Sequence, residues 1–223
     1  MLSETSILAL TLGGYLIGSL SFAVIVSRLM GLDDPRIYGS QNPGATNVLR
    51  SGNKKAAIAT LLFDALKGFV PVFVVNVWGA AWGLDDRAVA LVAIAAFIGH
   101  LWPVFFRFQG GKGVATAAGV LFGVEPLLGA MVMITWIVVA FVTRYSSLAA
   151  LLASILSPAY YLMGDTVWWH TSEAEMLAVM VMSALLVVRH KDNITRLLTG
   201  QESKIGAKKE AAAEPASDAN SPG

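Results

Sequence analysis

Long apolar runs dominate the chain as far as residue 188. Runs long enough to cross a membrane as helices occupy 6–27, 56–78, 88–106, 147–163 and 174–188, since about 20 helical residues span the hydrocarbon core. A further run, 113–143, holds Glu125 and Pro126 near its centre. Proline removes a backbone donor and a carboxylate is costly at mid-membrane depth, so we expect two short spans that meet there. The pattern predicts an all-α, polytopic integral membrane protein with seven transmembrane helices.

The positions of lysine and arginine support this number and indicate an orientation. With seven spans, 14 of the 16 cationic residues fall on one side of the membrane; the exceptions are Arg87 and Lys67, which lies within a span. With six spans, the cations after residue 188 would move to the other side. Because loops rich in Lys and Arg remain in the cytoplasm, we expect the N-terminus outside and the C-terminus inside.

Composition excludes several classes of function. Hydrophobic residues make up 56% of the 223 residues and charged residues 14%, which argues against a water-soluble enzyme. A net charge of +1 gives no concentrated basic surface, so no nucleic-acid partner is expected. The chain has no cysteine, and its three histidines lie far apart without carboxylates at ligand spacing. We therefore expect no disulfide, no metal site and no cofactor.

Some polar and small residues within the spans have a structural interpretation. Asp64 and Lys67 are three residues apart on one helix, where they are expected to pair. Glycines four residues apart allow helices to approach closely, and this predicts packing positions at Gly14 and Gly18, Gly79 and Gly83, and Gly119 and Gly123. Residues 1–202 are expected to form one transmembrane domain. The Ala-, Ser- and Pro-rich residues 203–223 are expected to form a disordered cytoplasmic tail.

The first polar cluster, RIYGSQNPGATNVLR at 36–50, lies in a loop that is longer than a connection requires. Its turn residues argue against disorder, and its donors suit phosphate oxygens. The alternative is a loop whose Asn and Ser side chains bond their own backbone. Candidate ligand-binding residues here are Ser40, Asn42, Thr46, Asn47 and Arg50, with Lys54 close behind.

The second cluster, GGKGVAT at 110–116, precedes the fourth span. Successive glycines let a ligand approach the main chain, and the free N–H groups that begin a helix attract anions. The sequence is not a Walker A motif, so a nucleotide is not implied. The cluster predicts a phosphate site built from Gly110, Gly111, Lys112, Gly113 and Thr116. The alternative is a glycine-rich helix start at which Lys112 extends to the membrane surface.

The third cluster, RHKDNITRLLTGQE at 189–202, follows the last span. It reads as an amphipathic helix with Arg189, His190, Asn193 and Arg196 on its aqueous face; a basic segment held by anionic lipid is the alternative. A fourth element, at 144–147, contributes Ser147. All four clusters fall on the predicted cytoplasmic side, where we expect any chemistry to take place.

These motifs, in this order on seven spans, resemble the bacterial PlsY family of membrane acyltransferases. The resemblance covers about 8–202 and rests on GSQNPGATNVLR at 39–50, GHLWPVFFRFQGGKGVAT at 99–116 and RHKDNITRLLTGQE at 189–202. It implies transfer of a fatty acyl group from acyl phosphate to glycerol 3-phosphate, which gives lysophosphatidic acid and starts phospholipid synthesis. It also implies an upstream enzyme that supplies acyl phosphate, and a location in the bacterial cytoplasmic (inner) membrane with the active site on the cytoplasmic side.

Carried over by position, the 110–116 motif and Ser147 match the donor-phosphate site of the family. We expect Lys112, Arg50, His190 and Asn193 to act in catalysis and the remaining candidates to bind substrate. The base is either His190 or a phosphate oxygen of the donor, and we favour the phosphate because no carboxylate in the sequence is placed to orient His190. The rival class is a small transporter of phosphate or a phosphorylated metabolite.

Overall fold

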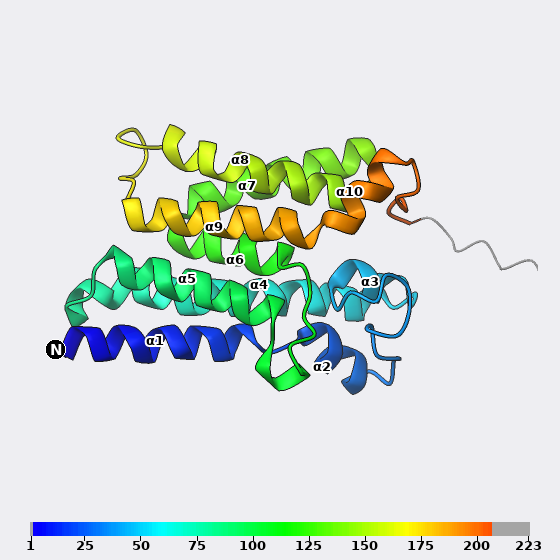
Figure 1. Cartoon of the computed structure of the whole chain (residues 1–223), viewed down its shortest axis with the longest axis horizontal. Helices are drawn as coiled ribbons and strands as arrows, with labels where there is room; N and C mark the ends of the chain where they lie inside the picture. Colours follow the sequence, from blue (N-terminus) through cyan, green and yellow to red (C-terminus); the bar gives the residue numbers. More distant parts are fainter. Residues whose placement is uncertain (1, 207–223) are drawn as a thin grey trace, which may run out of the picture.

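The chain folds into a bundle whose long helices run along one common axis (Figure 1). The computed structural model describes residues 2–206, which form helices, loops and one isolated bridge between Asp165 and Trp169, so the all-α prediction is confirmed for this part. The elements are α1 (Leu2–Gly18), α2 (Phe22–Leu29), α3 (Ala45–Leu49), α4 (Lys54–Trp78), η1 (Gly79–Trp82), α5 (Asp86–Leu101), η2 (Val104–Phe106), α6 (Val114–Val124), α7 (Pro126–Thr143), α8 (Ser146–Met163), α9 (Glu173–Arg189) and α10 (Lys191–Leu198).

Several of these helices are long and apolar enough to cross a bilayer. Within 2–206, four segments meet that requirement individually, and the bent pair of α1 and α2 makes a fifth. Helix α6 is apolar but has only 11 residues, and α9 has 17. The four segments are Lys54–Trp82, Asp86–Phe106, Pro126–Thr143 and Ser146–Met163.

The first apolar run does not form the single helix expected over 6–27. α1 and α2 meet at an angle of 44°, with residues 19–21 between them. This break removes the backbone carbonyl of Leu20 from the helical ladder, and Lys67 Nζ of α4 donates to it at 2.6 Å. Lys67 Nζ also lies 2.7 Å from Asp64 Oδ1, so the predicted pairing is confirmed. The pair therefore fastens the broken helix to α4.

Proline sets two other helix boundaries. The run 113–143 divides at the predicted place, because α6 ends at Val124 and Pro126 occupies the first position of α7, where its missing N–H is not needed. α5 ends at Leu101 instead of 106, because Pro103 disfavours helical backbone at the residue before it. The remaining residues of that run form the short helix η2.

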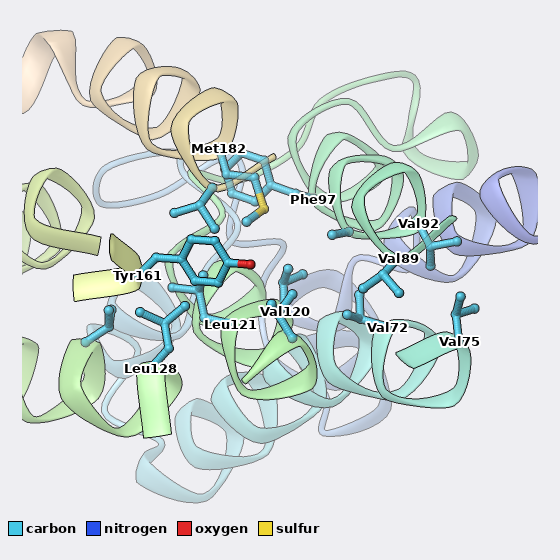
Figure 2. Close-up of a cluster of buried hydrophobic side chains, with 14 of the residues drawn as sticks. Val72, Val75, Val89, Val92, Phe97, Val120, Leu121, Leu128, Tyr161 and Met182 are labelled. Carbon is cyan, nitrogen blue, oxygen red and sulfur yellow. The ribbon is translucent and has the colours of Figure 1, made fainter. Parts of the chain in front are cut away.

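Close backbone contacts hold the bundle together. An added Cβ on Gly119 of α6 would lie 1.9 Å from the carbonyl oxygen of Ala65 in α4, and one on Gly18 of α1 would lie 2.1 Å from that of Ala96 in α5. The predicted packing role is confirmed at these two positions. It is wrong for Gly83, which ends η1 in a left-handed turn at φ +73, with open space where a Cβ would be. Figure 2 shows core side chains from α4 to α9 pointing toward one another, among them Phe97, Val120, Tyr161 and Met182.

Candidate active site

A cavity of about 780 Å³ is lined in part by residues of α3 and α10. These two helices lie at the same end of the bundle (Figure 1). The walls of the cavity combine all four polar clusters of the sequence with an apolar part formed by α6, α7, α8 and α9. The expected site residues that line it are Ser40, Asn42, Thr46, Asn47, Arg50, Lys54, Lys112, Gly113, Ser147, His190, Asn193 and Arg196. Stretches separated by up to about 150 residues in the chain thus share one pocket.

Three expected residues lie behind the wall. Thr116 is fully buried; its hydroxyl donates to the carbonyl oxygen of Asp64 at 2.9 Å and lies 3.0 Å from His100 Nδ1. The N–H of Gly111 donates to the carbonyl oxygen of His100 at 3.2 Å, and an added Cβ on Gly110 would lie 2.1 Å from that same oxygen. These residues pack the glycine-rich loop against the end of α5 and shape the pocket from behind.

The loop before α3 is organised by Asn47, which is 2% exposed. Its side-chain oxygen accepts from the backbone N–H of Ser40 at 2.9 Å, and its amide nitrogen donates to the carbonyl oxygens of Pro35 at 2.7 Å and Tyr38 at 3.2 Å. Asn47 therefore follows the alternative given for this cluster, in which a side chain hydrogen-bonds the backbone of its own loop. Ser40, Thr46 and Arg50 have exposed side chains on the pocket wall, where a ligand can reach them.

Lys112 enters the pocket from the start of α6. Gly113, at φ +85, begins that helix in a left-handed conformation that suits glycine. Lys112 Nζ donates to the side-chain oxygen of Asn193. Burial, together with the nearby Arg196 charge, lowers the pKa of Lys112 to about 8, while Glu202 and Asp192 oppose that shift. The ammonium group is therefore charged at neutral pH but holds its proton less tightly than an exposed lysine does.

His190, at the junction of α9 and α10, is 2% exposed. Its Nδ1 lies 2.8 Å from the carbonyl oxygen of Leu186, which can only accept, so Nδ1 carries the proton and Nε2 is left as an acceptor. Burial lowers the pKa of His190 to about 4, and the Lys112 charge acts in the same direction. The imidazole is therefore neutral at pH 7, and a backbone carbonyl rather than a carboxylate orients it.

Glu202 is a site residue that the sequence did not single out. Its carboxylate accepts from Ser147 Oγ at 2.6 Å, Asn193 Nδ2 at 2.6 Å and Arg196 Nε at 2.7 Å. Burial by itself raises the pKa of Glu202, but these three hydrogen bonds outweigh it and lower the pKa. The one sequence feature that could have indicated Glu202 is its position as an acidic residue at the end of the basic stretch 189–202 of an otherwise apolar chain. The carboxylate accordingly joins three donors that the sequence assigned to substrate.

The site lies in a chain with close relatives. A family model described as glycerol-3-phosphate acyltransferase matches residues 8–200. A glycerol-3-phosphate acyltransferase of Paraburkholderia phytofirmans is 61% identical over 206 residues, covering 91% of this chain and 93% of the relative. Another of that name, from Albidiferax ferrireducens, is 58% identical over 201 residues, covering 90% of each chain.

Solved structures agree with these relatives. The chain is similar to crystal structures of PlsY (YgiH), an integral membrane glycerol 3-phosphate acyltransferase, in its glycerol 3-phosphate form with a TM-score of 0.80 and in its lysophosphatidic acid form with 0.78. Identity is 37% in both comparisons, which cover 90% of this chain and 96% of the solved one. The family model, the sequence identities and the fold therefore agree, and the chain belongs to the PlsY family of integral membrane glycerol-3-phosphate acyltransferases.

Proposed function

We propose that the pocket holds acyl phosphate and glycerol 3-phosphate side by side and transfers the acyl group to the primary hydroxyl of glycerol 3-phosphate. The single observation that carries this proposal is the composition of the pocket wall. Arg50, Lys54, Lys112 and Arg196 line the cavity from α10 and from the ends of α3, α4 and α6, while apolar side chains such as Leu121, Val132, Trp136 and Met182 line it from within α6, α7 and α9. Such a wall suits two phosphate groups at the rim and one hydrocarbon chain below them.

The cations answer an electrostatic requirement of this reaction. Two unit negative charges about 5 Å apart repel each other by roughly 3 kcal/mol at an effective dielectric constant of about 20. We assign the donor phosphate to Lys112 and the 110–113 backbone, with Ser147 beside them. We assign the acceptor phosphate to Arg50, Lys54, Asn193 and Arg196, with Ser40, Asn42 and Thr46 as further donors. Positioning and offset of charge then supply most of the rate.

The state of His190 supports a substrate-assisted route. A general base works best when its pKa lies near the working pH, and a pKa of about 4 is far below that value. We infer that neutral His190 Nε2 accepts a hydrogen bond from the secondary hydroxyl of glycerol 3-phosphate, which leaves the O–H of the primary hydroxyl directed at a phosphate oxygen of the donor. The primary hydroxyl oxygen then attacks the acyl carbonyl carbon, the bond between that carbon and the phosphate oxygen breaks, and the departing phosphate takes the proton.

We also propose that the chain crosses the bacterial inner membrane seven times, with the N-terminus outside and the pocket on the cytoplasmic side. An upstream enzyme then supplies the pocket with acyl phosphate. Helices α6 and α9 are then the two shorter spans; both lie along the bundle axis beside the longer helices (Figure 1). Residues 1–202 form the acyltransferase domain in this proposal. Of the predicted disordered tail, 203–206 lies beside Arg144, whose carbonyl oxygen accepts from Ile205 at 2.7 Å, and 207–223 lies outside the described residues.

A direct assay tests the donor. The purified protein in detergent is expected to make lysophosphatidic acid from palmitoyl phosphate and glycerol 3-phosphate, without ATP or added metal. Palmitoyl-CoA in place of palmitoyl phosphate serves as the control and is expected to give no product. Product formation with palmitoyl-CoA, and none with palmitoyl phosphate, contradicts the proposed donor.

A further inference from the structure

Arg189, the last residue of α9, contacts the glycine-rich loop from behind. Its Nε donates to the carbonyl oxygen of Gly111 at 3.2 Å, and its Nη2 donates to those of Gly110 at 3.2 Å and Gly111 at 3.0 Å. The side chain is half-buried and does not line the pocket. The sequence placed it on the aqueous face with His190; that prediction is wrong, because the carbonyl groups of an irregular loop need donors and Arg189 supplies them.

These bonds set the direction of one peptide group. In a trans peptide the C=O and the N–H point in opposite directions. The carbonyl of Gly111 points to the guanidinium, so the N–H of the same peptide, which belongs to Lys112, points away from it. No backbone carbonyl within 2–206 accepts from that N–H. Arg189 thus orients an unoccupied donor on the residue whose side chain enters the pocket.

The opposite side of the loop is also fixed. The N–H of Gly111 donates to the carbonyl oxygen of His100, and an added Cβ on Gly111 would lie 2.3 Å from His100 Nε2. The loop is therefore held between the end of α5 and the end of α9. A guanidinium suits the contact between α9 and the loop carbonyls, because its N–H donors lie in a fixed planar fork that a lysine ammonium cannot reproduce.

The charge of Arg189 adds to the geometry. Among the described residues, no carboxylate oxygen lies within 4.0 Å of its guanidinium. A cation placed at the carbonyl end of the Gly111–Lys112 peptide polarises that group and makes its N–H a stronger donor. Hydrogen bonds to charged groups are stronger than neutral ones, so a donor of this kind favours a phosphate over water.

We propose that Arg189 is a positioning residue for the donor phosphate: by fixing the Gly110 and Gly111 carbonyls, it aims the Lys112 N–H at acyl phosphate. This inference rests on the proposed acyl-phosphate donor. It assigns to Arg189 an effect on the donor alone, because its hydrogen bonds go to the Gly110 and Gly111 carbonyls and none goes to a residue assigned to glycerol 3-phosphate.

The test compares Arg189→Gln with Lys191→Gln, which removes an exposed cation two residues away and touches no part of the pocket. Arg189→Gln is expected to raise KM for palmitoyl phosphate by about 10- to 100-fold, the equivalent of one or two charge-assisted hydrogen bonds. KM for glycerol 3-phosphate is expected to stay within about twofold of wild type, well under the factor that one hydrogen bond supplies. Lys191→Gln is expected to leave both values unchanged.

Arg189→Lys distinguishes the effect of the hydrogen-bond geometry of Arg189 from the effect of its charge. It also replaces Arg189→Gln in the test if that variant does not fold. It keeps the cation without the planar fork, so a smaller rise confined to KM for palmitoyl phosphate is expected. Wild-type behaviour of Arg189→Lys, or equal rises in both KM values in either variant, overturns the inference. Absence of turnover by the wild-type protein with palmitoyl phosphate would instead contradict the proposed function.

Discussion

Lys112 combines a site contact with an unusual acid strength. Its pKa of about 8 means that about 90% of the molecules carry the ammonium charge at pH 7 and about 10% at pH 9. If this charge holds the donor phosphate, kcat/KM for acyl phosphate is expected to fall as pH rises through about 8. A pH profile measured at subsaturating palmitoyl phosphate checks this expectation.

Two variants connect that profile to the residue. Lys112→Met is expected to lose most of its acyl-transfer activity in normally inserted protein, because the glycine-rich loop must then bind the donor phosphate without the positive charge of the Lys112 ammonium group. Lys112→Arg keeps a charge that cannot titrate in this range, so its remaining activity is expected to lack the alkaline decline. Near wild-type turnover of Lys112→Met contradicts the phosphate site.

His190 separates the two candidate bases. Glutamine keeps a hydrogen-bonding group but cannot act as a base, so His190→Gln is expected to raise KM for glycerol 3-phosphate about tenfold, roughly the value of one hydrogen bond, with kcat little changed. Steady-state kinetics at saturating palmitoyl phosphate give both constants. A fall in kcat of about 10²- to 10⁴-fold, which is the contribution of a general base, contradicts the substrate-assisted route.

At the scale of the element, the bundle depends on glycines that let backbones touch. Gly119→Ala places a methyl group against the Ala65 carbonyl and forces α4 and α6 apart, whereas Gly13 has no atom within 4 Å of an added Cβ. Overpacking typically costs about 1–3 kcal/mol, so a fall in Tm of about 3–10 °C is expected for Gly119→Ala. Gly13→Ala, the matched control, is expected to leave Tm unchanged or slightly raised. Equal Tm values for the two variants contradict this account.

Helix boundaries were predictable where proline marks them. Pro126 indicated the division of 113–143 correctly, because its effect is local to its own peptide. The break at 19–21 has no such marker. The break is stabilised by Lys67, 47 residues further along the chain, whose ammonium group donates a hydrogen bond to the Leu20 carbonyl oxygen. A contact over that sequence distance cannot be predicted from the local sequence. Gly83 was misassigned because spacing alone does not distinguish a packing glycine from one that ends a helix.

The same limit applies to the site. Arg50, Lys112, His190 and Asn193 could be predicted because polar residues are conspicuous in an apolar chain, and the pocket brings them together. Glu202 could not, because its importance lies in which donors it meets, and Ser147 is 55 residues away. The inward contact of Arg189 likewise depends on how α9 packs against the 110–111 loop.

At the scale of the whole molecule, the proposed orientation places the two ends of the bundle in different compartments. The chain has no cysteine, so single cysteines report topology without a background. Cysteine at Thr46 or Ser146, beside the pocket, is expected to react with a membrane-impermeant maleimide only from the cytoplasmic side. His170 is exposed near the first residues of α5 and α9, at the other end of the bundle. A cysteine introduced there by His170→Cys is expected to react only from the outer side of the membrane. Labelling of positions 46 and 170 from one side contradicts the seven-span arrangement.

The carboxylate of Glu202 gives the resting enzyme a counter-ion of its own. Ser147, Asn193 and Arg196 all donate to this carboxylate. If they bind phosphate as proposed, an incoming phosphate enters by exchanging one anion for another. A singly charged ion such as chloride gains little from that exchange, whereas a phosphate dianion offers more charge and more oxygen atoms than the carboxylate it displaces. Selectivity against the abundant small anions of the cell thus begins before either substrate has arrived.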